Sequence, residues 1–383
     1  MIYLDNNATT PLDPAVAEKM SQFSKEHFGN PSSLYPIGRE VKKIINKARS
    51  DIADSLRAHE SEIVFTGSGT EADNLAIRGV IDAHPEKNEF ITSVIEHPAV
   101  LETAKYLEKK GIKVRYVPVD QYGTIDLDFL KDSITSKTAL ISIMHANNEI
   151  GTIQPIEAIA KIAKQKGVLF HTDAVQSFGK TDVNVNKLGI DVLSISAHKI
   201  YGPKGIGALY IRKGTNILPI IYGGHQEKLM RAGTENTIGI LGFGEAVRVC
   251  NERKDKDKKQ IEKLADRLKK DIEKTIPNAK FNGHPKNRIK GTLNFSCFGL
   301  EGEAILLALA TKEIYVSTGS ACSQGSEESS HVLAAIGLSP VVARSSIRIS
   351  LGRFNSEEDI NILMAEIPQI IVKLREISPL DID

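Results

Sequence analysis

Apolar and polar positions follow two different periods along the first two thirds of the chain. Short apolar runs rich in β-branched residues predict strands, and segments with apolar residues at helical spacing separate several of them. Strands that alternate with helices predict βαβ units, and therefore an α/β fold with a mostly parallel sheet covered by helices. The predicted strands are 62–66, 89–96, 113–120, 138–146, 168–173, 191–198 and 207–213.

The pattern changes at residues 251–274, where charged residues dominate. Four apolar residues recur there at helical spacing and form one stripe: Ile261, Leu264, Leu268 and Ile272. We interpret this segment as a helix that leads into a smaller C-terminal domain, which continues with a strand at 291–297 and ends in a polar helix after Asn355.

Two domains are therefore expected. The large domain is predicted at 15–255, and a smaller α+β domain at 256–383, with segment 1–14 packing on the smaller domain. A chain of 383 residues is long enough for this division.

Composition argues against a nucleic-acid-binding, membrane-spanning or disulfide-rich protein. The net charge is +1 and charged residues make up 25% of the chain, so no strong field favours nucleic acid or a membrane surface. No apolar run approaches the roughly 18 residues that a membrane-spanning helix needs, and the N-terminus does not have the pattern of a signal peptide. Three cysteines do not make a disulfide framework, and no spacing indicates a metal site. We expect a cytoplasmic protein.

A glycine-rich turn, TGSGTEADN at 66–74, joins a predicted strand to a predicted helix. Backbone amides at a helix N-terminus bind phosphate, and Gly67, Gly69, Ser68 and Thr70 suit close approach by an anion. A plain tight turn is the alternative. The turn is neither a P-loop nor a Rossmann fingerprint, since both patterns are incomplete.

Four predicted strand ends carry polar side chains of the types that catalytic and ligand-binding sites use. They are His97, the cluster HANNEIG at 145–151, Asp173, and the pair His198 and Lys199. Each alone reads more simply as a structural residue or a helix cap. Open α/β sheets bind ligands at the carboxyl ends of their strands, so we expect the four on one side. Pyridoxal phosphate needs such a set: a phosphate site, a carboxylate for its pyridine nitrogen and a lysine for its aldehyde.

Nine motifs together resemble the NifS/IscS-type cysteine desulfurases, class V members of the fold-type I pyridoxal phosphate-dependent enzymes. They occur in order and cover about residues 2–379. The motifs are LDNNATTP (4–11), GNPSS (29–33), GSGTEADN (67–74), HANNEIG (145–151), HTDAVQ (171–176), SAHKIYGPKG (196–205), RAGTEN (231–236), GSAC (319–322) and SSIRISLGR (345–353).

The resemblance implies catalytic and cofactor-binding roles for individual residues. Lys199 is the Schiff-base lysine, Asp173 pairs with the pyridine nitrogen, and His97 stacks on the ring and serves in acid–base steps. Asn147 and Gln176 contact the phenolic oxygen of the cofactor. The phosphate is held by Gly69, Thr70, Ser196 and His198, and by Thr234 of a neighbouring subunit, which implies a homodimer.

The resemblance also implies the substrate. Arg348 binds the carboxylate of L-cysteine, a bidentate task suited to a guanidinium, and Asn30 and Asn147 add further substrate contacts. The sulfur passes to Cys322 as a persulfide, and L-alanine is released.

Cys322 is set apart from the other cysteines by its surroundings. Cys250 and Cys297 lie in helical and strand patterns, where we expect buried, inert thiols. Cys322 lies in the glycine- and serine-rich segment 317–330, which predicts an exposed, mobile thiol. Ser329 stands where many relatives have proline, a difference expected to loosen this segment.

Two matters stay open at this point. The sulfur acceptor is an iron–sulfur scaffold protein or a tRNA-thiolation enzyme; relatives that dock the scaffold carry a longer C-terminal tail than SPLDID. Alternative functions are another class V enzyme, such as an aminotransferase or a selenocysteine lyase, and a non-catalytic binding protein. The thiol of Cys322 favours the desulfurase, and the retention of Lys199 and Asp173 disfavours a protein without catalysis.

Overall fold

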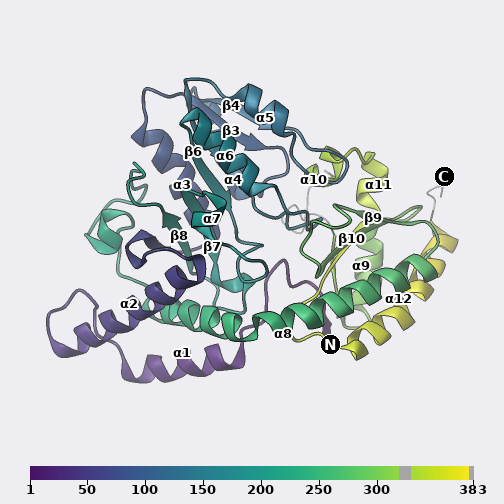
Figure 1. Ribbon diagram of the computed structural model, residues 1–383. Coiled ribbons are helices and arrows are strands. Elements are labelled where there is room, and N and C mark those ends of the chain that lie inside the picture. The colour runs from purple at the N-terminus through teal and green to yellow at the C-terminus, as the bar shows by residue number, and fades with distance from the viewer. Residues whose placement is uncertain (319–328, 379–383) are drawn as a thin grey trace.

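The computed structural model describes residues 1–318 and 329–378, and its largest unit is a mostly parallel sheet (Figure 1). Seven strands of the described residues form this sheet in the order β2-β8-β7-β6-β5-β3-β4. The pairs within β7-β6-β5-β3-β4 are parallel, and β8 runs antiparallel to both of its neighbours. The strands are β2 (Ile63–Thr66), β3 (Glu89–Ser93), β4 (Lys113–Val117), β5 (Thr138–Ser142), β6 (Leu169–Asp173), β7 (Val192–Ser196) and β8 (Gly207–Ile211). All seven predicted strand segments are confirmed.

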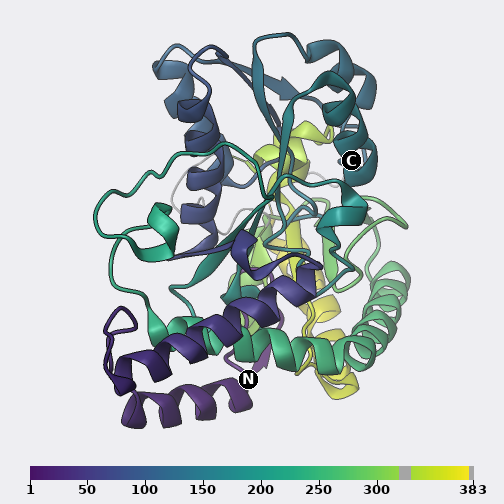
Figure 2. The ribbon, with the colours of Figure 1, turned by 60° about the vertical axis from the view of Figure 1, so that its left-hand side comes forward.

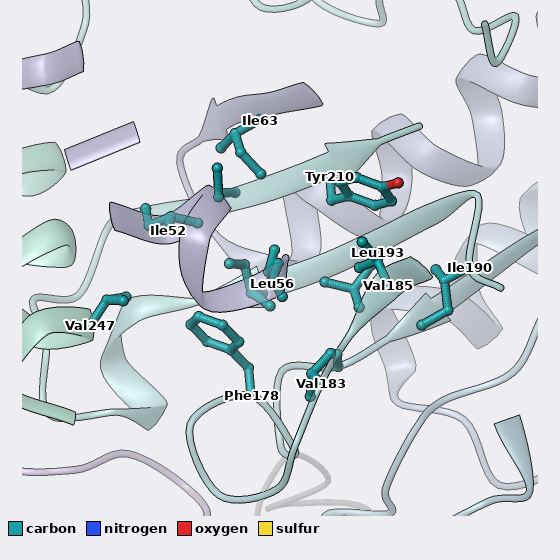
Figure 3. Close-up of a cluster of buried hydrophobic side chains, with 14 of the residues drawn as sticks. Ile52, Leu56, Ile63, Phe178, Val183, Val185, Ile190, Leu193, Tyr210 and Val247 are labelled. Carbon is teal, nitrogen blue, oxygen red and sulfur yellow. The ribbon is translucent and has the colours of Figure 1, made fainter. Parts of the chain in front are cut away.

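Helices cover both faces of the sheet. Apolar residues of α3 (Gly69–Ala83) and α4 (Pro98–Lys109) pack on one face, around Phe90 and Leu140. The opposite face packs against helices α2 (Pro36–Leu56), α5 (Leu127–Ser133), α6 (Ile156–Lys166) and α7 (Val185–Leu188). In Figure 3 side chains from α2, β7, β8 and the segment around Phe178 point toward one another on this opposite face. The predicted α/β fold is confirmed.

A 39-residue helix, α8 (Thr237–Thr275), extends along the lower edge of the molecule in Figure 1. Its first half packs against α2 and α1 (Pro14–Glu26); in Figure 2 α2 crosses in front of α8 and α1 lies below it. Its second half buries the apolar stripe seen in the sequence, with Leu264, Leu268 and Ile272 in a separate core. The helix expected from residue 251 onward is therefore the second half of a longer one.

The second core belongs to a smaller antiparallel unit. Its sheet has the order β12-β13-β10-β9, with β9 (Ala279–Asn282), β10 (Thr292–Cys297), β12 (Ser317–Thr318) and β13 (Ser346–Ser350). Helices α9 (Gly302–Ala310) and α12 (Glu357–Ile377) cover it, and α10 (His331–Ala335) and α11 (Pro340–Arg344) lie between its strands in sequence. The last helix was expected to be polar, which is wrong: α12 buries an apolar face that includes Ile360, Leu363 and Ile367.

The N-terminal segment also joins this smaller unit. Strand β1 (Ile2–Tyr3) pairs in parallel with β11 (Ile314–Tyr315), and Leu4 lies in the second core. The exact domain bounds stay a prediction. Short 3-10 helices complete the described chain: η1 (Glu60–Glu62), η2 (Ala197–Lys199) and η3 (Gln226–Leu229). Within residues 1–318 and 329–378 we find no helix of the length and hydrophobicity that crossing a bilayer requires.

Candidate active site

A cleft of about 460 Å³ lies at the carboxyl ends of β6 and β7, where the N-terminal segment and β13 of the smaller unit meet the large sheet. Residues far apart in the sequence converge on it, as expected for the strand ends of an open α/β sheet. Nine residues predicted as site residues line this cleft: Gly69, Thr70, His97, Asp173, Gln176, Ser196, His198, Lys199 and Arg348.

The turn between β2 and α3 forms one wall of the cleft. Ser68 caps the helix, because its hydroxyl accepts a hydrogen bond from the Glu71 amide at 3.1 Å. At Gly69 an added Cβ would lie 2.8 Å from Cγ2 of Val175, so a larger residue would displace a cleft wall. The first amides of α3 have no carbonyl four residues earlier to accept from them, and they make this end of the helix attractive to an anion.

Asp173 ends β6 as a buried carboxylate. Its residue is 5% exposed, and its Oδ1 accepts a hydrogen bond from the Val175 amide at 2.8 Å. Burial raises the pKa of Asp173 to about 6, against the opposing effects of that hydrogen bond and of Lys199. The carboxylate is therefore mostly ionised at neutral pH, a negative charge at the floor of the cleft.

Lys199 follows β7 within the short helix η2. Its amine donates hydrogen bonds to the backbone carbonyls of Asn7 at 2.6 Å and Ala8 at 2.7 Å. The turn that carries it is held by the same N-terminal segment, since the Thr10 amide donates to the His198 carbonyl at 3.0 Å. The N-terminal segment thus fixes both the backbone and the amine of the lysine.

Two histidines of the cleft are neutral at pH 7. His97 caps α4, with Nδ1 accepting from the Ala99 amide at 3.1 Å, which leaves the proton on Nε2. Burial, followed by the charge of Lys199 and by His331, lowers the pKa of His97 to about 4. Burial and Lys199 likewise lower the pKa of His198 to about 4.

Arg348 enters the cleft from β13 and is 2% exposed. Its guanidinium donates to Asp5 Oδ1 at 2.7 Å and to the Asn148 carbonyl at 3.1 Å. Its buried Nε has no hydrogen-bond partner among the described residues. Asp5 therefore holds the guanidinium in place while leaving donor capacity unused.

Comparison with known proteins decides the family. The model for aminotransferase class-V matches residues 2–363. A cysteine desulfurase IscS of Dictyoglomus turgidum is 51% identical over 379 residues, which is 99% of this chain and 96% of the relative. The chain belongs to the cysteine desulfurases of the aminotransferase class-V family.

Solved structures agree with this family. A structure titled NIFS-like protein superposes with a TM-score of 0.92 at 40% identity, covering 97% of this chain and 100% of its own. A structure of SspA in complex with cysteine has a TM-score of 0.82 at 39% identity, with 93% of this chain and 100% of its own covered. Enzymes of this family depend on pyridoxal phosphate.

Some residues that the desulfurase resemblance singles out do not line the cleft of a single chain. The Asn147 side chain is used within the protein, donating to the Ile95 carbonyl at 2.9 Å and accepting from the Glu149 amide, and it is Asn148 that lines the cleft. Asn30 is exposed before α2, and its side chain accepts from the Ser32 amide. The roles of Asn147 and Asn30 stay predictions.

Thr234 and Cys322 are the two remaining predicted residues of the desulfurase site. Thr234 lines a separate pocket beside Gly67 and Arg231, and its predicted role belongs to a neighbouring subunit. Cys322 lies outside the described residues. The other two cysteines are buried as expected, and burial raises the pKa of Cys297 to about 12, which keeps its thiol protonated and inert.

The cleft also contains carboxyl groups that the sequence did not single out. Burial raises the pKa of Glu96 to about 8 and that of Glu149 to about 7. Burial and the charge of Asp173 raise the pKa of Asp73 well above its ordinary value, and its Oδ1 has no hydrogen-bond partner among the described residues. Each lies within or beside a strand-end motif of the sequence, but a motif does not reveal that its carboxylate is buried.

Asn7, Lys180 and His331 were missed as well. Asn7 lies in LDNNATTP and lines the cleft, as does His331, whose Nε2 is 3.0 Å from the Glu96 carbonyl. Lys180 donates to the side chains of Gln176 at 3.0 Å and Asn7 at 3.2 Å. Its spacing of four residues from Gln176 was the signal that could have placed it on the same side of the turn.

Proposed function

We propose that this protein is a pyridoxal phosphate-dependent cysteine desulfurase that converts L-cysteine to L-alanine and leaves the sulfur on Cys322 as a persulfide. The observation that carries the proposal is the convergence of Lys199, Asp173, His97 and Arg348 on one cleft beside the N-terminus of α3. The full-length relatives named cysteine desulfurase support it further.

The residues of the cleft fit the cofactor of this family. The turn at 66–70 offers backbone amides, hydroxyls and a position where only glycine fits, which suits a phosphate. The ionised carboxylate of Asp173 suits a protonated pyridine nitrogen, and Lys199 supplies an amine. When bound, the cofactor provides an aldehyde for amines and a ring that accepts electrons from the substrate carbon.

The substrate is an amino acid held by its carboxylate. Arg348 is buried, fixed by Asp5 and left with an unpartnered Nε, so it retains capacity for an anionic ligand. The solved relative in complex with cysteine supports the choice of L-cysteine. Lys199 would supply the amine that moves the proton of the α-carbon.

His97 and Cys322 carry the sulfur step. His97 is neutral at pH 7 and holds its proton on Nε2, so it can exchange a proton with the substrate. The Cys322 thiolate attacks the substrate sulfur and the carbon–sulfur bond breaks. In net balance the hydrogen of the Cys322 thiol replaces the sulfur on the β-carbon, which gives L-alanine and the persulfide.

Replacement of single cysteines tests the sulfur step. Cys322→Ala is expected to reduce alanine formation from L-cysteine to background, because the acceptor thiol is lost. Cys250→Ala is the matched control, since Cys250 is buried and donates only to the Gly179 carbonyl; it should keep wild-type turnover per folded protein. A Cys322→Ala variant with full activity on L-cysteine would remove the proposal.

We also propose a homodimer in which Thr234 serves the cleft of the partner subunit. Thr234 does not line the cleft of its own chain but a separate pocket. Large apolar side chains are exposed at Phe28 (84%), Leu34 (81%) and Tyr222 (79%), as expected for a surface that a second copy covers. The sulfur acceptor is an iron–sulfur scaffold or a tRNA-thiolation enzyme, and the cytoplasm is the proposed location.

Mixed dimers test the role of Thr234. Co-expressed Lys199→Ala and Thr234→Ala chains should regain activity, because one of the two sites then combines an intact Lys199 with an intact Thr234. Lys199→Ala with Arg348→Ala is the control and should regain none, since both residues serve the cleft of their own chain. Full activity of Thr234→Ala alone, or no regain in the first mixture, would contradict the proposal.

A further inference from the structure

Asn7 is 4% exposed, and all of its polar atoms have partners. Its amide donates to one hydroxyl, its side-chain nitrogen donates twice, and its side-chain and backbone oxygens accept from three side chains. The partners are Ser350 Oγ (2.9 Å), Asn148 O (3.0 Å), Thr292 Oγ1 (2.8 Å), Lys180 Nζ (3.2 Å), Gln176 Nε2 (2.8 Å) and Lys199 Nζ (2.6 Å).

We propose that Asn7 is a positioning residue for Lys199. Its side chain fixes the orientation of its own backbone carbonyl, which together with the Ala8 carbonyl binds the Lys199 amine whenever that amine is not bonded to the cofactor. We call these two acceptors the amine-binding carbonyls. The inference rests on the proposed function, because it assigns Asn7 a part in the lysine's cycle.

The amine-binding carbonyls need to be held by something other than secondary structure. Asp5 makes the last bridge of the N-terminal segment to β13, and residues 6–8 form a turn. A peptide in a turn can rotate unless side chains hold it. Gln176 and Ser350 each bond the backbone of Asn7 once, and the Asn7 side chain adds three contacts, to the loop after β5 (Asn148), to β10 (Thr292) and to the turn after β6 (Lys180).

The geometry suits an amine rather than a nitrogen bonded to a cofactor. Lys199 donates to two carbonyls at 2.6 and 2.7 Å, which requires at least two hydrogens on its nitrogen. Once that nitrogen is doubly bonded to carbon it carries at most one hydrogen, so one of the two contacts must be lost. The amine-binding carbonyls therefore serve the stage at which the substrate has displaced the lysine, and they keep its amine near the proton that it must move.

Asn7 also connects the two units of the fold at this point. Ser350 and Thr292 belong to the sheet of the smaller unit, whereas Gln176, Lys180 and Lys199 follow strands of the large sheet. The position of the Lys199 amine thus depends on how the smaller unit sits against the large sheet.

The neighbouring Asn6 provides a matched control. It is 5% exposed, and its side chain donates to the Ser350 carbonyl at 2.8 Å and lies 3.3 Å from Asn355 Oδ1. No hydrogen bond between its side chain and Lys199, Gln176 or Lys180 exists in the described structure. Asn6→Ala therefore removes buried hydrogen bonds from the same turn without touching the hold on the amine-binding carbonyls.

The first measurement is the acylation rate of Lys199 by acetic anhydride in cofactor-free protein, followed by peptide mass spectrometry. We expect Asn7→Ala to label at Lys199 at least about fivefold faster than wild type and Asn6→Ala to label like wild type, because only the first variant loosens the acceptors that protect the amine. Equal labelling of Lys199 in the two variants would overturn the proposal.

The second measurement is steady-state turnover of L-cysteine by the cofactor-loaded enzyme. We expect kcat of Asn7→Ala to fall about tenfold or more with KM within about twofold, since the lysine acts after substrate has bound. A fall shared equally by Asn6→Ala would mean a structural role only. Inactivity of the wild-type enzyme on L-cysteine would instead reject the proposed function and leave the labelling result standing.

Thr292→Val carries the test if Asn7→Ala does not fold. It is close in shape to the wild-type residue and removes only the acceptor of one Asn7 hydrogen bond. It is expected to change labelling and kcat in the same direction as Asn7→Ala but less; wild-type values of both would contradict the proposal.

Discussion

Individual side chains of the cleft are kept in their neutral or charged forms by burial. Glu96 and Glu149 have raised pKa values of about 8 and 7, and His97 and His198 have lowered values of about 4, in each case with burial as the largest cause. At neutral pH Glu96, His97 and His198 therefore carry little charge, whereas Asp173, Lys199 and Arg348 in the same cleft are charged.

Glu96→Gln tests this electrostatic account through stability. Because the folded-state pKa of Glu96 is raised, the folded protein holds its proton up to about pH 8, whereas the unfolded chain releases it near pH 4.5. This group's stabilisation is complete at low pH and is lost as pH rises toward 8. Glutamine does not titrate, so the free energy of unfolding of the variant relative to wild type should rise by on the order of 2–4 kcal/mol between pH 5 and 8.

Urea unfolding at several pH values measures this difference. Glu18→Gln is the control for the loss of one exposed carboxylate. A relative stability of Glu96→Gln that stays constant from pH 5 to 8 would show that Glu96 is ionised in the fold.

At this scale the sequence predicted residue types better than their orientation. Lys199 and Asp173 were expected to share a site because they follow predicted strands, and Arg348 because of the resemblance to the cysteine desulfurases; all three line the cleft. Adjacent asparagines could not be distinguished. Consecutive residues in a turn point different ways, and only the fold decides that Asn148 rather than Asn147 lines the cleft.

At the scale of elements, the segment that carries Thr234 is held by a buried ion pair. Arg49 of α2 donates to both oxygens of Glu227 at 2.7 Å, and one of these oxygens also accepts from the Phe65 amide of β2. Glu227, Lys228 and Leu229 all have left-handed backbone angles, with φ of 45°, 56° and 70°. Such a turn is strained for residues other than glycine, so the ion pair must hold it.

Removal of Arg49 or Glu227 alone should therefore lower the free energy of unfolding strongly. Arg49→Met leaves Glu227 buried without its cation, and we expect a loss of about 3–5 kcal/mol in the free energy of unfolding, largely recovered in the double variant with Glu227→Gln. The exposed pair formed by Lys263 of α8 and Glu357 of α12 is the control, and its removal should cost below about 1 kcal/mol. Urea unfolding of the wild type, Arg49→Met, the double variant and the control variant measures these differences. A loss of stability in Arg49→Met that is no larger than in the control would contradict the account.

The sequence predicted elements well where one face had a clear period. All seven strands of the large sheet were found because parallel strands buried on both faces read as apolar runs. Helix α8 was not recognised as one helix: its second half shows a clear stripe, whereas its first half is apolar on several sides and showed only a short helical pattern before Cys250. The turn at 227–229 has no sequence signal, because its backbone angles depend on the distant Arg49.

On the scale of the whole molecule, the cleft lies between two units that each have a hydrophobic core. The large sheet supplies Asp173 and Lys199, the smaller unit supplies Arg348, and α8 contributes residues to both cores. The N-terminal segment crosses between the units and binds the Lys199 amine. The proposed function is the removal of sulfur from L-cysteine bound in this cleft.

The most direct test of that function is to incubate the cofactor-loaded protein with L-cysteine, quantify alanine, and locate added sulfur by peptide mass analysis. The account predicts one alanine per sulfur transferred and a mass increase of one sulfur atom on the peptide with Cys322, with none on the buried Cys250 and Cys297. Lys199→Ala should give neither product. Alanine formed without sulfur on Cys322, or sulfur found on Cys250 or Cys297 instead, would contradict the account.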